Sequence, residues 1–305
     1  MKNILSLLII LFLFFSCNPT KKNKSAAENI PGIDTLKPQT FIPELDDKLI
    51  EISGLLIYDE LFWGFNDSGG RNKIYGFNNK GEIEKEIEIK DAKNNDWESI
   101  TQDDKNIYIG DFGNNMGSRE NLCIYKIKKK DIQNKKTQKI DSHKIEIKYA
   151  KQTQFIHLPQ STVFDCEAMA EFNGSLYIFS KNWKEYTTSV YKIPTKKGKY
   201  TLSALDTFNV NGLITGADVS PNKKQLALVG YKNCQSFIWL FSDFTDDNFF
   251  KGNSNYFHLH ETGNAQTEGI CYRDNNTLLV SCEQTKAFKQ QVFLFDISTI
   301  NNGSH

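Results

Sequence analysis

Acidic side chains recur at one position of a repeated strand–turn–strand pattern. The pattern is clearest where Asp96-Trp97-Glu98-Ser99 opens one apolar run and a second run, Ile107–Phe112, carries Asp111 near its end. Asp and Glu oxygens are the ligands that hard cations such as calcium prefer. Carboxylates that face one another across a strand pair are destabilising unless a cation or a proton lies between them. The pattern therefore predicts an acidic cluster that binds a metal ion or a ligand.

Five copies of this pattern organise the chain. Aligned on Ser53, Glu98, Glu167, Ala217 and Glu268, they are separated by 45, 69, 50 and 51 residues. A repeat of about 50 residues in a strand-rich chain is typical of a propeller blade. We expect an all-β propeller of five four-stranded blades, closed by an N-terminal strand at Thr40–Leu45 that completes the fifth blade. Six blades are the alternative, if the long insert around the lysine-rich residues 128–139 hides a degenerate blade instead of forming a solvated outer loop.

Opposing residues follow if each hairpin is centred on its turn. This places Glu98 opposite Asp111, Glu167 opposite Ser180, and Glu268 opposite Glu283, all at the mouth of the central channel. The candidate metal ligands are Glu98, Asp111, Glu167, Glu268 and Glu283, and Ca²⁺ is the expected ion. An alternative is that each acid caps its own loop by accepting hydrogen bonds from backbone amides.

Polar loops at the same end of the blades indicate ligand recognition. Two of these loops, Asn66–Arg71 and Asp111–Arg119, end in arginine, although the chain has only three arginines. The corresponding place of the third copy holds Lys181-Asn182-Trp183. Arginine suits the recognition of an anionic group. The candidate ligand-binding residues are Asp67, Arg71, Asn114, Arg119, Lys181 and Trp183. The alternative is ordinary turn chemistry, which uses the same residue types.

The first segment has the features of a lipoprotein signal peptide. A basic start precedes the apolar run Ile4–Phe15, which is too short to span a bilayer, and Phe14-Phe15-Ser16-Cys17 resembles a lipobox. We expect lipidation at Cys17, a flexible polar tether over residues 18–38, and a single propeller domain over residues 39–305. Asn18 favours the outer membrane, and the lysines at 21, 22 and 24, in place of the acidic residues of some surface-export signals, favour the periplasmic side over the cell surface. A secreted protein with an incidental cysteine is the alternative.

Composition excludes several other functions. The 37 basic and 37 acidic residues balance, and no basic block carries interleaved aromatics, so no nucleic-acid partner is expected. No serine-hydrolase elbow or phosphate-binding loop is present. Five cysteines follow Cys17 without a Cys-x-x-Cys pair, and buried free thiols are the expected state.

Four short segments of the repeat resemble those of secreted β-propeller lipoproteins near the SdiA-regulated and esterase-like-phytase groups. They are Asn66–Gly69, Asp96–Ile100, Ile109–Asn115 and Glu167–Met169. The resemblance covers Ile52 to Phe295 and concerns the style of the repeat, not a catalytic motif. It implies the propeller fold and a calcium-dependent hydrolase.

Three functions are compatible with these observations. The favoured one is a lipid-anchored binding module for an envelope protein or a small anionic ligand. The first alternative is a calcium-dependent hydrolase of a phosphate ester or lactone. The second is a structural envelope component. Converging carboxylates would indicate a metal site, an open aromatic-rimmed mouth would indicate a binding module, and a plugged channel would indicate a structural role.

Overall fold

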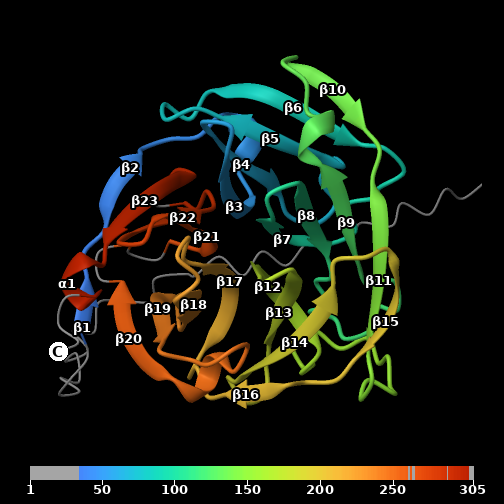
Figure 1. Cartoon of the computed structure of the whole chain (residues 1–305), viewed down its shortest axis with the longest axis vertical. Coiled ribbons are helices and arrows are strands. Elements are labelled where there is room, and N and C mark those ends of the chain that lie inside the picture. The colour runs from blue at the N-terminus through green and yellow to red at the C-terminus, as the bar shows by residue number, and fades with distance from the viewer. Residues whose placement is uncertain (1–33, 260–261, 263–264, 287, 302–305) are drawn as a thin grey trace, which may run out of the picture.

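Five sheets stand around a common axis and form a five-bladed β-propeller (Figure 1). The computed structural model describes residues 34–259, 262, 265–286 and 288–301. Helical structure in these residues is limited to the 3₁₀ turns Asp47–Leu49, Lys129–Asp131 and Phe249–Lys251, and to α1 (Ser298–Asn301). The predicted fold class and blade number are confirmed.

Each blade has four antiparallel strands, ordered from the axis outward. Blade one consists of β3 (Ile52–Tyr58), β4 (Leu61–Asn66), β5 (Lys73–Phe77) and β6 (Ile83–Ile89). Blade two consists of β7 (Trp97–Gln102), β8 (Asn106–Asp111), β9 (Cys123–Lys128) and β11 (His143–Tyr149). Blade three consists of β12 (Asp165–Phe172), β13 (Ser175–Lys181), β14 (Thr188–Pro194) and β16 (Asp206–Phe208). Blade four consists of β17 (Leu213–Val219), β18 (Gln225–Lys232), β19 (Gln235–Ser242) and β20 (Asn253–Leu259). Blade five consists of β21 (Thr267–Asp274), β22 (Thr277–Cys282), β23 (Gln291–Asp296) and β2 (Gln39–Ile42).

The N-terminal strand β2 closes the ring, as predicted. It pairs antiparallel with β23 in blade five. Beyond the strand, the Leu45 amide donates to the Gln290 carbonyl at 2.9 Å, and the Gln290 side-chain amide donates to the Leu45 carbonyl at 2.8 Å. Ile42 is fully buried in a cluster that includes Val292. Closure of this kind pairs the outer edge of the last blade without adding a further element.

Three blades carry a fifth, parallel strand on the outer edge, which the sequence pattern did not reveal. β10 (Thr137–Ile140) pairs with β6, β15 (Gly198–Leu202) pairs with β11, and β1 (Asp34–Leu36) pairs with β20. The segment that joins β9 to β11 of blade two thus adds β10 to blade one, and the segment that joins β14 to β16 of blade three adds β15 to blade two.

These strands lie in three segments for which the sequence pattern suggested other structure. The insert around residues 128–139 contributes one strand to blade one, so it is neither a sixth blade nor entirely a solvated loop. The segment after β14, where four-stranded blades call for a single outer strand, is divided between β15 on blade two and β16 on blade three. The first described strand, β1 (Asp34–Leu36), lies within the segment predicted as a tether.

The inner strand of every blade has a register irregularity near its mouth end. The shifts lie between Ser53 and Leu56, Trp97 and Ser99, Cys166 and Ala168, Ile214 and Gly216, and Thr267 and Ile270. Glu98, Glu167, Thr215 and Glu268 fall within these shifts, so Thr215, not Ala217, is the equivalent residue of blade four. A bulge breaks the alternation of side chains and redirects the bulged residue.

The predicted opposing pairs are therefore wrong by one residue at the mouth. Trp97, not Glu98, pairs with Asp111, and Cys166, not Glu167, pairs with Ser180. Thr267 pairs with Cys282, so Glu268 does not pair with Glu283. Counting pairs outward from the turn is valid only where the two strands pair without a break. Each inner strand has one extra residue at its bulge, so every pair beyond the bulge shifts by one.

Small residues follow the bulged position and allow the five inner strands to approach closely. They are Gly54, Ser99, Ala168, Gly216 and Gly269. A Cβ on Gly269 would lie 2.6 Å from the carbonyl carbon of Gly54, and a Cβ on Gly216 would lie 2.6 Å from the Glu268 carbonyl oxygen. The Ser53 and Thr215 hydroxyls donate to carbonyls of the next blade, at 3.0 and 2.8 Å. The inner strands contact one another in a closed ring.

Buried apolar side chains fill the space between neighbouring blades. Cys123, Cys166, Cys271 and Cys282 are buried free thiols, as predicted for these positions. The proposed signal peptide, Cys17 and residues 18–33 of the tether lie outside the described residues. Within the described part of the chain, no helix is long and apolar enough to cross a membrane.

Ile42→Ala tests the closure by β2. Removing a fully buried side chain from the closing strand is expected to lower the free energy of unfolding by about 2–5 kcal/mol, measured by urea denaturation. Thr40→Ala, on an exposed residue of the same strand, is the matched control and is expected to change stability by less than about 0.5 kcal/mol. Equal stability of the two variants would contradict closure by this strand.

Candidate functional site

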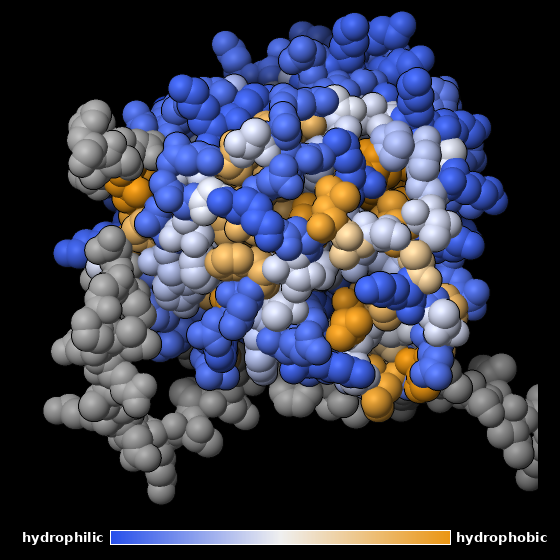
Figure 2. Space-filling view, turned by 60° about the horizontal axis from the view of Figure 1, so that its bottom comes forward, coloured by the Kyte–Doolittle hydropathy of each residue, from blue (hydrophilic) through white to orange (hydrophobic). Residues whose placement is uncertain are grey.

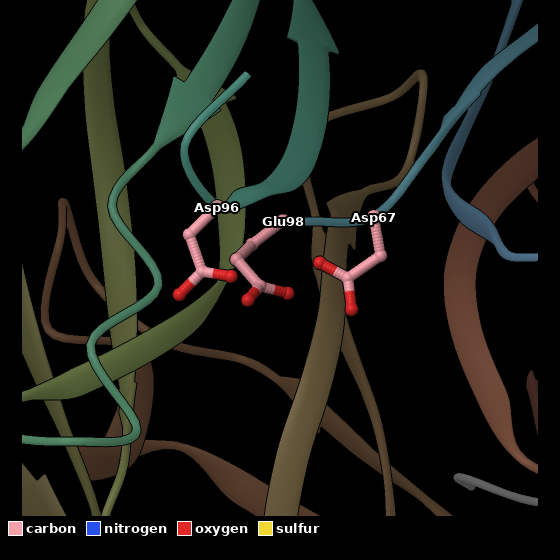
Figure 3. Close-up of side chains that lie close together, drawn as sticks. All are labelled: Asp67, Asp96 and Glu98. Atoms are coloured by element: carbon pink, nitrogen blue, oxygen red, sulfur yellow. The ribbon is translucent and has the colours of Figure 1, made fainter. Parts of the chain in front are cut away.

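Three carboxylates meet at the channel mouth, the end of the ring at which the inner strands begin. Asp67 follows β4, Asp96 precedes β7, and Glu98 lies in the bulge of β7. One ligand oxygen from each lies within 4.8 Å of the other two. Figure 3 shows the three side chains extending in the same direction, from two neighbouring blades. We name these residues the acidic triad.

Glu98 has the most unusual environment of the triad. The residue is only 6% exposed; its carboxylate accepts no hydrogen bond from the described residues, and its oxygens keep contact with solvent at the mouth. Burial, followed by the charges of Asp67, Glu167 and Asp96, raises the pKa of Glu98 well above its usual value. A buried carboxylate without a donor is costly unless it binds a proton or a cation.

The other two members of the triad also favour the protonated form. Burial, followed by the neighbouring acids, raises the pKa of Asp96 to about 8, although Arg119 opposes this with a nitrogen 3.9 Å from the Asp96 carboxylate. Burial raises the pKa of Asp67 to about 6, and its carboxylate accepts a hydrogen bond from the Ser68 amide. The triad therefore contains more negative charge than its surroundings neutralise.

Glu167, Glu268 and Glu283 form the other half of the mouth, together with one lysine. Lys181 Nζ lies 2.5 Å from Glu167 Oε2, and both side chains are buried. Burial raises the pKa of Glu268 to about 7 and that of Glu283 well above its usual range, with mutual repulsion adding to the shift of Glu283. Burial opposes the charge of Lys181, but Glu167 and other neighbours raise its pKa well above the usual value.

Asp111 and Asp165 have a different role, which matches the loop-capping alternative. Asp111 accepts hydrogen bonds from the Asn95 side chain at 2.7 Å, the Asp96 amide at 3.1 Å and Arg119 Nη2 at 2.8 Å. Asp165 accepts from the Asn114 amide and from Trp183 Nε1, both at 2.7 Å. Both carboxylates are fully buried and supplied with donors, so they hold the mouth loops in place.

Most of the expected anion-binding residues are also part of this scaffold. The Arg119 guanidinium donates to the Gly113 carbonyl at 2.7 Å as well as to Asp111. Asn114 donates to Asp165 and to the Phe164 carbonyl, and Trp183 donates to Asp165. Arg71 is exposed at the surface. Of this group, only Asp67 and Lys181 join the acidic residues of the mouth.

Sequence reasoning missed Asp96 and Asp165 as site residues, and it missed the role of Gly113. A Cβ on Gly113 would lie 2.3 Å from Glu98 Oε1 and 2.4 Å from Asp96 Oδ2. Glycine at this position is thus what allows the two carboxylates to lie against the backbone. The available signal was the short spacing between Asp96 and Glu98, which a regular strand would have placed on the same face.

Beyond the mouth, the inner strands leave little open space. A hollow of about 50 Å³ is lined by residues of β3, β7, β17 and β21, among them Asp218 and Cys271. Burial raises the pKa of Asp218 to about 7. This hollow holds a few water molecules at most.

A long irregular loop, residues 150–164, lies beside the mouth. It is hydrogen-bonded to the loop between β8 and β9. The Leu158 amide donates to the Met116 carbonyl at 3.0 Å, and the Gln160 amide donates to the Asn115 carbonyl at 2.8 Å. Its Phe155, Ile156 and Leu158 are three of the six large apolar side chains that are exposed among the described residues. Figure 2 shows one face of the molecule, which is mainly hydrophilic with scattered apolar patches. A second hollow, of about 360 Å³, is lined by Ile156, Leu158, Phe164, Lys151 and Lys184.

Comparison with known proteins identifies no family. No protein-family model matches the chain, and no curated protein matches it. The resemblance to the SdiA-regulated and esterase-like-phytase groups therefore remains a hypothesis. Among solved structures, the hydrazine synthase of Kuenenia stuttgartiensis is similar at a TM-score of 0.44 and 10% identity, over 93% of this chain and 82% of that chain. A nidogen/laminin complex gives a TM-score of 0.43 and 14% identity, over 79% of each chain. Both similarities are too distant to indicate a function.

The raised pKa values predict an unusual dependence of stability on pH. Because the folded protein keeps protons on Asp67, Asp96 and Glu268 that the unfolded chain releases near its ordinary pKa values of 3.8 and 4.5, folding binds protons. The free energy of unfolding of the cation-free protein should therefore fall by several kcal/mol as the pH rises from about 5 to about 8. Urea denaturation in the presence of a chelator measures this change. Glu98→Gln should reduce the fall, whereas stability that rises over this range in the wild-type protein would contradict the assignment.

Proposed function

We propose that the protein is a binding module whose channel mouth holds one hard divalent cation, with calcium as the expected ion, on the acidic triad. The observation that carries the proposal is the Glu98 carboxylate, which belongs to a largely buried residue, keeps contact with solvent at the mouth and faces two further carboxylates. A cation at this point would replace the protons that the triad otherwise needs and would remove the repulsion among its members.

The spacing of the triad supports calcium. Calcium binds oxygen ligands at about 2.3–2.6 Å, so two ligands of one ion lie at most about 5 Å apart. The triad oxygens lie within 4.8 Å of one another. Calcium takes about six to eight oxygens, and three carboxylates provide between three and six. The remaining positions are available to water or to an oxygen of a ligand.

The loop beside the mouth supports an anionic ligand with an apolar part. Exposed Ile156 and Leu158 would bury such a part in the hollow of about 360 Å³, and Lys151 and Lys184 line the same hollow. Ligand sites commonly combine an apolar lining with a few polar groups of this kind. The backbone bonds to Met116 and Asn115 hold the loop in place, which lowers the entropy lost on binding.

A second candidate is the calcium-dependent hydrolase of a phosphate ester or lactone. It is favoured by the Glu167–Lys181 pair, which lies in the same acidic cluster as the triad and supplies groups that can exchange protons with a metal-bound water. Calcium-dependent turnover of such a substrate, abolished by Glu98→Gln, would establish this activity in place of simple binding.

We propose that the module acts at the cell envelope, tethered to the outer membrane through lipidated Cys17 and facing the periplasm. This proposal depends on the sequence of residues 1–17 alone. Incorporation of labelled palmitate, absent from Cys17→Ser, is the measurement that would support it.

Calcium titration of the wild-type chain and of Glu98→Gln tests the metal site. Calcium at about 100 times its dissociation constant should stabilise the wild-type protein by about 2.7 kcal/mol, which raises the melting temperature by about 5–10 °C. Glu98→Gln should lose most of this rise because it removes a charged ligand without changing the shape of the side chain. Glu146→Gln, on a half-exposed acid of an outer strand, is the matched control and should keep the full rise. A wild-type melting temperature that calcium does not change would contradict the metal site.

Replacement of the exposed apolar side chains tests the ligand surface. The triple variant Phe155→Ser/Ile156→Ser/Leu158→Ser should bind calcium with unchanged affinity but should lose binding of a short-chain fatty acid by at least about tenfold, measured by calorimetry. Leu205→Ser, which alters an exposed apolar residue outside this loop, is the control. Unchanged fatty-acid binding by the triple variant would exclude the loop as the ligand surface.

A further inference from the structure

We infer that Asn94 is a positioning residue of the acidic triad, which joins blade one to blade two and holds Asp67 opposite Asp96 and Glu98. The inference rests on the proposed function, because its subject is the calcium site. Asp67 comes from blade one, directly after β4, whereas Asp96 and Glu98 come from blade two (Figure 3). The two parts of the site therefore need a contact that fixes the distance between them.

The Asn94 side chain makes this contact through three hydrogen bonds. Its Nδ2 donates to the Asn66 carbonyl at 2.9 Å and to the Asp67 carbonyl at 3.0 Å, both in blade one. Its Oδ1 accepts from the Trp97 amide of β7, in blade two, at 3.1 Å. The residue is only 9% exposed, so water competes little for these groups. The three partners use both hydrogens and the oxygen of the side-chain amide, which fixes the end that faces blade one.

The two carbonyls that accept from Asn94 flank the Cα of Asp67. The Asn66 carbonyl belongs to the peptide group before this Cα, and the Asp67 carbonyl belongs to the peptide group after it. Because each peptide group is planar, fixing both of them fixes the two backbone dihedrals of Asp67 and with them the direction of its Cα–Cβ bond. The Asp67 amide also donates to the Glu51 carbonyl at 3.0 Å, which holds the first peptide group from its other side. Asn94 thus directs the Asp67 side chain toward the triad.

The blade-two part of the triad is held from both blades. Trp97, whose amide donates to Asn94, lies between Asp96 and Glu98 in the chain. From blade one, the Ser53 hydroxyl donates to the Glu98 carbonyl at 3.0 Å. Each blade therefore fixes the backbone of a ligand that the other blade contributes. These bonds hold the carboxylates together against their repulsion, which lowers the cost of arranging them around an ion.

The glycine-rich loop after Asp67 leaves room for the Asn94 amide. A Cβ on Gly70 would lie 3.2 Å from Asn94 Nδ2 and 3.1 Å from the Asp67 carbonyl oxygen. The Gly70 amide donates to the same carbonyl at 3.3 Å, so this oxygen accepts two hydrogen bonds. Part of the loop Asn66–Arg71, which the sequence indicated as a ligand-recognition loop, thus supports Asp67.

Calorimetric calcium titration of the full chain tests this inference. Asn94→Ser keeps an oxygen for the Trp97 amide but is too short to donate to the Asp67 carbonyl. It should weaken calcium binding by about 10–100-fold, the usual effect of removing a group that orients a metal ligand. Asn182→Ser is the matched control, because Asn182 is also buried and holds a mouth loop of blade three through two backbone amides. This control should keep wild-type affinity.

A double-mutant cycle separates positioning of Asp67 from a general effect on the fold. Once Asp67→Asn is present, adding Asn94→Ser should weaken binding by less than about twofold further, because the ligand that Asn94 directs is already lost. The cycle is measured with Tb³⁺, whose higher charge keeps the weakened sites measurable. Equal weakening by Asn94→Ser in both backgrounds would show that Asn94 does not act through Asp67 and would overturn the inference.

Gly70→Ala provides a second test if Asn94→Ser does not fold. It keeps every bonding group but presses a Cβ against the Asn94 amide, and it should weaken calcium binding by at least about threefold. Unchanged affinity of folded Asn94→Ser, or of Gly70→Ala in its place, would overturn the inference and leave the triad site intact. A wild-type chain that binds no calcium would overturn both the inference and the proposed function.

Discussion

The repulsion among buried carboxylates at the channel mouth is the constraint on which the remaining structure depends. Blades one, two, three and five each contribute at least one acid, and the closed ring of inner strands prevents these acids from moving apart. Closure by β2 and the small residues after each bulge keep the ring narrow, so the cost of ionising the mouth cannot be relieved by expansion. It must be relieved by protons, by Lys181 or by a metal ion.

Two kinds of acid lie side by side in this mouth, and their hydrogen-bond donors distinguish them. Asp111 and Asp165 accept several short bonds from amides and side chains, which makes them parts of the loop framework. Glu98 is almost as deeply buried but has no donor among the described residues. The framework acids thus fix the loops on which the unsatisfied acids are presented. Loop capping therefore applies to Asp111 and Asp165, whereas the proposed metal binding applies to Glu98 and its neighbours in the triad.

The repeat made much of this architecture predictable. Alternating apolar residues, polar turns and the spacing of the copies led to five blades, to closure by the N-terminal strand and to an acidic mouth. The register at the mouth was not predictable, because a bulge at Glu98 or Glu167 changes no local pattern of residue types. The exchange of β10 and β15 between blades depends on long-range pairing of edge strands. Asp96 lies just before β7, and the spacing of two residues from Glu98 is the only sequence signal that places it in the site.

Anomalous diffraction from crystals grown with terbium, a luminescent substitute for calcium, tests the central claim most directly. One strong peak is predicted at the channel mouth, within about 2.3–2.6 Å of oxygens from Asp67, Asp96 and Glu98. The absence of any peak at the mouth, with the three carboxylates bonded to one another through protons, would contradict the claim and would leave the acids without a ligand-binding role.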